Sequence, residues 1–315
     1  MSDKKLITVI GATGAQGGGL VRAILNDPKK EFAVRAVTRD PNSDKAKHLA
    51  ALGAEVVAAN MDDQQSLEHA FEGSYGAFCV TNFWEHFSAE KETVQAKNMA
   101  EAAKNAGVQH VIWSTLEDTR KWVPLDDDRM PTLNGKYKVP HFDGKGESNQ
   151  YFMDAGVPAT FLIASWYFDN MIYFGAGPKR GDDGTLAITF PMGEARLSGI
   201  AAEDIGKCAL GILKRPELAG KTVGIAGDEP TCARMAETLT KIFGEEVKYN
   251  EVTPAQYRSF GFPGADDLGN MFQFYQEFED DCCKIRDLGY SKELNPEIQD
   301  FETWAKSNAK RIPIA

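Results

Sequence analysis

Lys145 and His141 are the residues of this chain whose types and spacing first suggest chemistry. Hydride transfer to a carbonyl leaves an oxyanion that must be protonated. A tyrosine hydroxyl one helical turn before a lysine often supplies the proton, because the lysine lowers the tyrosine pKa. In the stretch VPHFDGKGE (139–147) the residue four positions before Lys145 is His141. Either the histidine replaces the tyrosine as the acid, or the chain holds a cofactor without using it.

Two interpretations of this pair stay open. An imidazole has an unperturbed pKa of about 6.5 and can protonate an oxyanion, which allows an NADPH-dependent reductase of a small carbonyl or enone using Lys145 with His141. In the other interpretation Lys145 only binds a ribose, and His141 starts a helix. Pro140 separates Tyr137 from Lys145, so we expect that tyrosine to lie outside the helix. Ser114 supplies one further hydroxyl at the end of a predicted strand.

A glycine-rich turn, VIGATGAQGGG (9–19), follows the first predicted strand and starts a helix. Gly11 allows a sharp turn off the strand, Gly14 lets the backbone approach a pyrophosphate, and Gly17 lets the helix pack closely on the sheet. The helix N-terminus offers unpaired N–H groups to phosphates, and Thr13 and Gln16 can add hydrogen bonds. In this strand–turn–helix context the spacing predicts a dinucleotide site.

The end of the second strand, in AVTRDPNSDKAK (36–47), indicates which dinucleotide binds. An NAD-binding chain usually places an acid there for the ribose 2′-hydroxyl. Here Arg39 follows the strand, and its guanidinium can stack on adenine or bind a 2′-phosphate. Asp40 comes one position too late for the ribose, and Lys45 adds positive charge. We predict NADP as the cofactor, with NAD as the less favoured alternative.

Two other stretches follow predicted strands and are expected at the same cleft. Asp62 and Asp63, in NMDDQQSL (60–67), can cap the next helix or meet the adenine amino group. Thr81, Asn82 and Phe83, in VTNFWE (80–85), follow the fourth strand, and we expect them over the ribose and nicotinamide. No metal site is predicted.

The elements that would position these residues alternate regularly through residues 1–165. Near-continuous apolar runs separated by long intervals are typical of parallel strands buried on both faces and joined by crossover helices. We therefore predict an α/β fold, with a doubly wound parallel Rossmann sheet in 1–165 that receives strand contributions from later segments. The predicted strands are 6–10, 32–37, 54–59, 76–80, 110–114 and 159–163. The predicted helices are 15–26, 45–52, 64–72, 88–106 and 142–155.

Residues 166–315 are predicted to form a smaller, mainly α-helical C-terminal region that binds a substrate or partner. Its predicted helices are 201–213, 235–244 and the aromatic-rich end of 261–279, with a strand at 247–253. The aromatic stretch FQFYQEFE (272–279) is expected to pack between the two parts. Two segments rich in charge, proline or glycine, 119–140 and 174–185, are expected to be mobile.

The composition of the chain disfavours nucleic acids and membranes as partners. The formal net charge of −11 disfavours direct binding to nucleic acid or to an anionic membrane surface. No apolar run approaches the roughly 18 residues of a membrane span. Five scattered cysteines suggest reduced thiols, and we expect a cytoplasmic protein that can also be nuclear. The neighbours Cys282 and Cys283 are expected to be unpaired, a vicinal disulfide being the alternative.

Several of these stretches together resemble the NmrA-like family: GATGAQGG, VTRDP, MDDQQSL, VTNFWE, HFDGKGE, YFDN and GFPGADDLGNMFQFY. Members of this family are atypical short-chain dehydrogenase relatives that bind NADP(H). The resemblance covers nearly the whole chain. It implies a Rossmann domain with a small C-terminal domain, and a redox sensor that signals cofactor state to regulatory protein partners without dehydrogenase activity. It also allows a homodimer.

The resemblance carries cofactor contacts onto particular positions of this chain. One departure affects the 2′-phosphate end, where sensor-type members have basic residues and this chain has Asn42 and Ser43. The implied cofactor-binding residues are Gly11, Ala12, Thr13, Gly14, Ala15, Gln16, Gly17, Arg39, Met61, Asp62, Thr81, Asn82, Phe83, Lys145, Tyr167, Phe168, Asp169 and Asn170.

Overall fold

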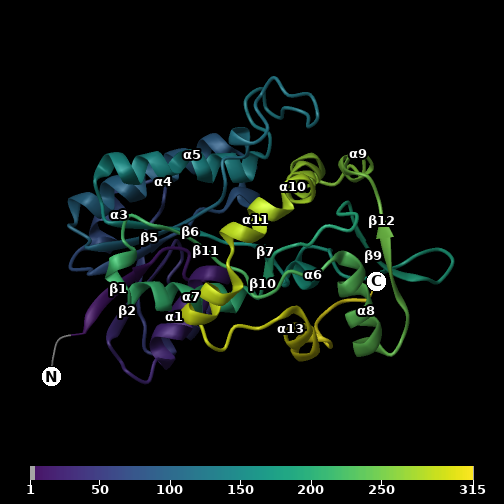
Figure 1. The fold of residues 1–315 in the computed structure, drawn as a ribbon. Helices are drawn as coiled ribbons and strands as arrows, with labels where there is room; N and C mark the ends of the chain where they lie inside the picture. Colours follow the sequence, from purple (N-terminus) through teal and green to yellow (C-terminus); the bar gives the residue numbers. More distant parts are fainter. Residues whose placement is uncertain (1–3, 315) are drawn as a thin grey trace.

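A seven-stranded sheet, parallel throughout, forms the centre of the first part of the molecule (Figure 1). The computed structural model describes residues 4–314, and the sheet has the order β11-β6-β5-β4-β1-β2-β3. Its strands are β1 (Lys5–Val9), β2 (Phe32–Thr38), β3 (Glu55–Ala58), β4 (Gly76–Cys79), β5 (His110–Thr115), β6 (Ala159–Ile163) and β11 (Thr222–Gly224). The six predicted strands are confirmed to within a residue or two at their ends.

The strands are buried because helices cover both faces of the sheet. Strands β4, β5 and β6 have every residue buried, which explains their continuous apolar sequences. On one face lie α1 (Ala15–Asn26), α2 (Asp44–Ala51) and α7 (Ala202–Leu213), whose apolar side chains share a core with the sheet. On the other lie α3 (Gln64–Phe71), α4 (Ala89–Asn105) and α5 (Pro140–Ala155). Short 3₁₀ turns occur at η1 (Phe83–Glu85), η2 (Thr119–Lys121) and η3 (Pro216–Leu218). Strand β11 and helix α7 come from beyond residue 166, so later segments do contribute to the Rossmann part.

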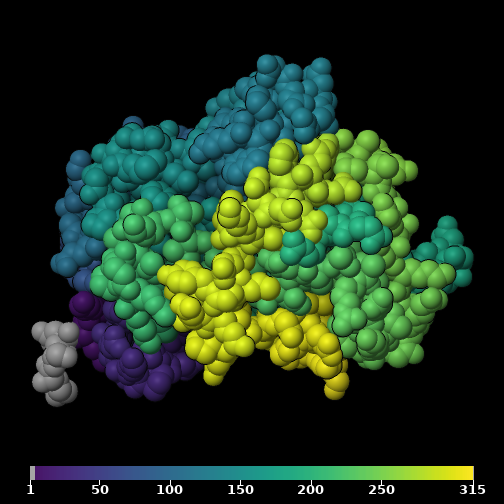
Figure 2. Space-filling model, in the orientation of Figure 1, coloured from purple at the N-terminus to yellow at the C-terminus, as the bar shows by residue number. Residues whose placement is uncertain are grey.

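The C-terminal region has its own apolar core and a small sheet as well as helices. The small sheet has three strands in the order β12-β9-β8. In Figure 2 the C-terminal segment of the chain, in yellow, crosses from one half of the molecule to the other. The strands of this region are β7 (Trp166–Tyr167), β8 (Lys179–Arg180), β9 (Leu186–Phe190), β10 (Gly199–Ile200) and β12 (Val247–Glu251). The helices are α6 (Asn170–Tyr173), α8 (Cys232–Phe243), α9 (Pro254–Arg258), α10 (Ala265–Glu277), α11 (Glu279–Ile285), α12 (Leu288–Leu294) and α13 (Phe301–Asn308).

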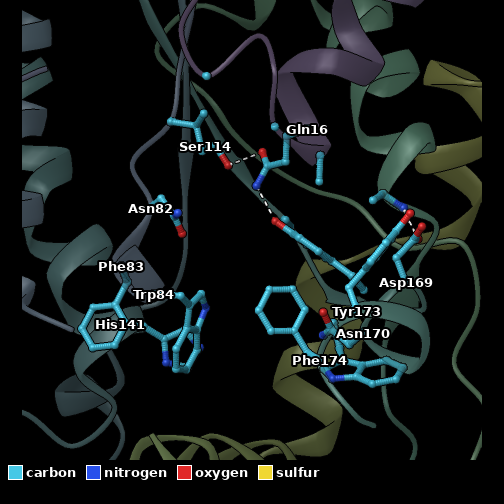
Figure 3. Close-up of a pocket in the computed structure, with 18 of the residues that line it drawn as sticks. Gln16, Asn82, Phe83, Trp84, Ser114, His141, Asp169, Asn170, Tyr173 and Phe174 are labelled. Carbon is cyan, nitrogen blue, oxygen red and sulfur yellow. Dashed lines mark hydrogen bonds between the residues drawn. The ribbon is translucent and has the colours of Figure 1, made fainter. Parts of the chain in front are cut away.

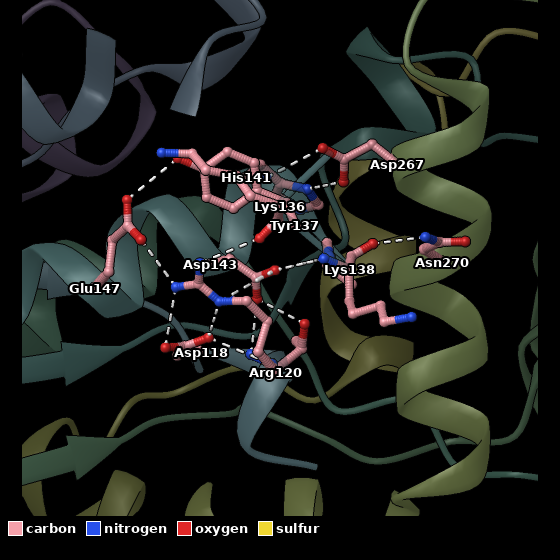
Figure 4. A network of polar contacts seen from close by, with 12 residues as sticks. Asp118, Arg120, Lys136, Tyr137, Lys138, His141, Asp143, Glu147, Asp267 and Asn270 are labelled. Carbon is pink, nitrogen blue, oxygen red and sulfur yellow. Dashed lines mark hydrogen bonds and ion pairs between the residues drawn. The ribbon is translucent and has the colours of Figure 1, made fainter. Parts of the chain in front are cut away.

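Buried hydrogen bonds hold parts of segment 119–140 to α5 and to one another (Figure 4). The fully buried carboxylate of Asp143 accepts hydrogen bonds from the backbone N–H groups of Thr119 at 2.7 Å and Lys138 at 2.8 Å. Lys138 is itself buried, and its ammonium donates to the carbonyls of Asp127 and Met130. These bonds fix the segment because an unsatisfied buried polar group would cost free energy.

Two further expectations concern the state of Cys282 and Cys283 and the absence of a membrane-spanning helix. Cys282 and Cys283 are free thiols, and burial raises the pKa of both, which disfavours the reactive thiolate. No helix within residues 4–314 combines the length and apolar character that crossing a membrane requires.

Candidate active-site cleft

A cleft of about 1750 Å³ opens at the carboxyl ends of the parallel strands and continues into the C-terminal region. Crevices at this end of a doubly wound sheet are where ligands bind. Figure 3 shows its central part, with Gln16 and Ser114 at the sheet and Trp84 facing Phe174 across the opening. The predicted residues that line it are Gly11, Thr13, Gly14, Ala15, Gln16, Gly17, Arg39, Met61, Thr81, Asn82, Phe83, His141, Lys145, Tyr167, Asp169 and Asn170.

Three predicted cofactor residues lie outside this lining. Ala12 is buried behind the glycine turn. The carboxylate of Asp62 accepts a hydrogen bond of 2.9 Å from Gln95, which lowers the Asp62 pKa, while Asp63 caps α3. Phe168 is fully buried, and its ring packs in the C-terminal core, not toward the cleft.

The glycine turn has the shape that a pyrophosphate requires. Gly11 has a φ of +67°, and a Cβ on Gly17 would lie 2.4 Å from the Gly11 carbonyl oxygen, so neither position accepts a side chain without strain. Helix α1 begins at Ala15, and among residues 4–314 no side chain caps its N-terminus. Its first N–H groups therefore remain available to an anion. The turn thus fits a dinucleotide phosphate.

Gln16 links two sides of the cleft through its side-chain amide (Figure 3). Its oxygen accepts a hydrogen bond of 2.7 Å from Ser114 at the end of β5, and its nitrogen donates to the Tyr167 hydroxyl at 2.5 Å. Burial raises the pKa of Tyr167 to about 12. Tyr167 belongs to β7 and not to the lysine helix, and its hydroxyl is engaged by Gln16.

Lys145 is held by a carboxylate that sequence reasoning did not identify. Its ammonium donates to Glu92 at 2.6 Å and to the Thr81 hydroxyl at 2.7 Å. Glu92 comes from α4 and is fully buried, and its second carboxylate oxygen has no hydrogen-bond partner in the described chain. Because Glu92 is fully buried and the Lys145 side chain is only 11% exposed, the carboxylate offsets the positive charge of Lys145. Lys145 remains in the lining, where it can reach a ribose.

His141 is held by a second unforeseen carboxylate, Asp267 of α10 (Figure 4). The backbone N–H of His141 donates to Asp267 at 3.1 Å, and its ring Nδ1 contacts the other carboxylate oxygen. A carboxylate only accepts, so Nδ1 carries a proton. The imidazole also packs on Trp84, with ring centroids 4.9 Å apart, and it lines the cleft. In the described chain Nε2 has no hydrogen-bond partner, which leaves it for a ligand.

Aromatic side chains line the part of the cleft next to His141, which we call the aromatic compartment. Several of these side chains are open to solvent, including Tyr173 at 64% exposure, Phe174 at 69% and Phe260 at 48%. Helix α10 was predicted as an aromatic packing helix, and its Phe272 and Tyr275 do lie in the C-terminal core while also facing the cleft. The aromatic residues of this compartment are Trp84, Phe87, Tyr173, Phe174, Tyr257, Phe260, Phe262, Phe272, Tyr275 and Trp304.

The parallel sheet, the glycine turn at α1 and the cleft across the strand ends define a Rossmann-type dinucleotide fold. The chain belongs to the NmrA-like family, whose sequence profile matches residues 3–305. The predicted family and fold class are therefore confirmed.

Known proteins resemble the chain over most of its length. An NmrA-like family domain-containing protein of Dictyostelium discoideum is 28% identical, over 87% of this chain and 88% of that protein. The NmrA-like family domain-containing oxidoreductase malD of Malbranchea aurantiaca is 32% identical, over 79% of this chain and 76% of its own length. The crystal structure of NmrA, a negative transcriptional regulator, in complex with NADP superposes with a TM-score of 0.77 at 23% identity, covering 96% of this chain and 94% of that one.

Arg39 provides a direct test of NADP preference. Its guanidinium lines the cleft and pairs with Glu85, and both side chains are exposed. Charged hydrogen bonds are worth about 1.5–3 kcal/mol, so Arg39→Glu is expected to weaken NADP binding by about 10–100-fold while NAD binding changes little. Calorimetric titration with each cofactor measures this. The matched control is Arg234→Gln, which removes an exposed, paired arginine of α8 outside the cleft lining. Equal losses for both cofactors would contradict the role of Arg39.

Proposed function

We propose that this protein is an NADPH-dependent reductase whose second ligand, a carbonyl compound or enone, binds in the aromatic compartment. The observation that carries the proposal is the size and lining of the cleft beyond the glycine turn. A single organic ligand usually occupies a pocket of roughly 300–1,000 Å³, whereas this cleft measures about 1750 Å³. The cleft thus has room for a cofactor and a second molecule, and that molecule need not be small.

The glycine turn and its neighbours would hold the cofactor. The N-terminus of α1 suits the pyrophosphate, Arg39 suits the 2′-phosphate, and Lys145 suits the nicotinamide ribose. The complex of NmrA with NADP supports this assignment for a relative of the same fold. NADPH, when bound, supplies a hydride to the carbonyl carbon of the second ligand.

His141 then has the role of proton donor. The carbonyl oxygen gains an electron pair as its carbon accepts the hydride, and it takes a proton from Nε2 of the imidazolium. Asp267 stabilises the imidazolium and keeps the ring oriented through Nδ1, so it is a positioning residue. Solvent restores the proton to His141 after the alcohol leaves.

A second candidate function is a non-catalytic sensor that signals the NADP(H) state to a regulatory protein partner. The observation that favours it is the lysine helix itself, which lacks a tyrosine four residues before Lys145 and neutralises the lysine with buried Glu92. The relatives point both ways, since malD is named an oxidoreductase and NmrA a negative transcriptional regulator. A sensor requires that the two redox forms of the cofactor stabilise different states of the protein.

Steady-state absorbance distinguishes these functions. Purified protein with NADPH should show loss of the NADPH band that depends on added bulky aromatic ketones, enones or quinones. Tryptophan fluorescence measures cofactor binding in the same samples. Binding of NADPH without turnover of any compound would overturn the reductase proposal and support the sensor. Absence of NADP(H) binding would overturn both.

A further inference from the structure

The outer end of the aromatic compartment carries positive charge. Lys179 and Arg311 both line the cleft, and the Lys179 ammonium lies 3.7 Å from the position that a Cβ on Gly175, two residues after Tyr173, would take. Arg311 donates a hydrogen bond to the Tyr173 hydroxyl, and its guanidinium lies over the Tyr173 ring, 5.8 Å from the centroid. Within the described chain the Lys179 ammonium has no carboxylate within salt-bridge distance, although the chain carries 46 acidic residues against 35 lysines and arginines.

Acidic side chains of the lining lie elsewhere or are engaged. Glu85 pairs with Arg39 and Glu203 pairs with Arg22, both at the cofactor end. After residue 203 the lining contains no carboxylate among the described residues. Asp169 also lines the cleft, where its carboxylate accepts the Ala202 N–H at 2.8 Å. Among the described lining residues, an anion at this end therefore meets two cations.

The aromatic walls of the same compartment are uncovered. Tyr173 and Phe174 lie across the opening from Trp84 and His141 in Figure 3, and Phe262 is also exposed, at 39%. Large apolar side chains gathered around a concave opening mark a ligand site. Aromatic rings bind flat ring systems by stacked and edge contacts, each adding to the area buried. The walls therefore favour a planar ligand of more than one ring.

We propose that the aromatic compartment binds a planar, polycyclic aromatic compound that carries a carboxylate, with the rings between the aromatic walls and the carboxylate at Lys179 and Arg311. Where the proposed reductase function holds, this compound is its substrate, and its reducible carbonyl faces His141. The binding claim itself does not need turnover. It rests on the two cations, Lys179 and Arg311, and on the aromatic walls of the compartment, and not on the glycine turn.

Two probes of nearly equal shape, one anionic and one neutral, test whether a carboxylate on the ligand strengthens binding. We expect 2-naphthoate to bind the NADP⁺-loaded protein more tightly than the neutral 2-naphthamide, measured by quenching of tryptophan fluorescence and by calorimetry. Exposed ion pairs contribute up to about 1 kcal/mol each, so the double variant Lys179→Gln/Arg311→Gln should weaken naphthoate binding by up to about 30-fold. The same variant should leave naphthamide binding unchanged. Both side chains are exposed, so the variant is expected to fold.

Two further variants complete the design. Phe262→Ala should weaken both probes together, because it removes part of an aromatic wall, and Arg234→Gln should affect neither. Equal affinity for naphthoate and naphthamide, or no effect of the double variant, would overturn the proposal. Failure of the reductase function would appear differently, as naphthoate binding of the expected strength without NADPH oxidation by any aromatic carbonyl acid.

Discussion

Glu117→Gln is expected to lower the free energy of unfolding by about 3–5 kcal/mol, because it leaves a buried guanidinium without its counter-ion. Arg286 is fully buried and donates to both carboxylate oxygens of Glu117, at 2.5 and 2.9 Å. Two more of its N–H groups donate to the Ala164 carbonyl at 3.0 Å and to the Cys282 carbonyl at 3.3 Å. Glutamine keeps the size of the side chain but removes the charge that the arginine requires.

Urea denaturation followed by circular dichroism measures this loss. The matched control is Glu237→Gln, which breaks the exposed pair with Arg234 and should change stability by less than about 1 kcal/mol. The double variant Glu117→Leu/Arg286→Met should recover part of the loss, because apolar side chains of similar volume replace both charges. A Glu117→Gln protein as stable as its parent would mean that the pair does not hold this region together.

The position of this ion pair gives it a role in the cleft. Glu117 follows β5 of the Rossmann sheet, and Arg286 follows α11 of the C-terminal region. The guanidinium lies over the ring of Tyr275, which lines the cleft, with its carbon 5.5 Å from the centroid. The pair thus connects one wall of the compartment to the carboxyl end of β5, an interior strand of the sheet. Mutations here should disturb both stability and the second ligand site.

Much of the Rossmann part could be predicted because its signals are local. Each strand is a short apolar run, and helix α5 ends at Gly156 with a φ of +70°, as the sequence AGVP predicts. The glycine turn also depends on neighbours in sequence. The short strand β11 gave no comparable signal, since Thr222–Gly224 has three residues and joins the sheet only through its pairing with β6. Strand β9 was missed beside the turn-rich segment 177–185.

The partners that tune the site could not be predicted, because they are distant in sequence. Asp267 lies 126 positions from His141, and Arg286 lies 169 positions from Glu117. Glu92 stands in a helix whose sequence is rich in charge and reads as solvent-exposed, yet its side chain is fully buried. Only the packing of α4 and α10 against α5 brings these carboxylates to the lysine helix.

If the protein is a reductase, His141→Ala is expected to lower kcat by about 10²–10⁴-fold, the range for loss of a general acid. NADPH affinity should stay close to that of the parent, since the glycine turn and Lys145 are unchanged, and tryptophan fluorescence checks this. Added imidazole should restore part of the rate, which a purely structural role for His141 would not allow. Asp267→Asn should also lower kcat, because it removes the carboxylate that orients the ring.

Variants at the two candidate proton donors, His141 and Lys145, separate this mechanism from the remaining alternative. If His141→Ala keeps its rate while Lys145→Met loses it, the proton comes from Lys145, and Glu92 becomes the carboxylate that controls it.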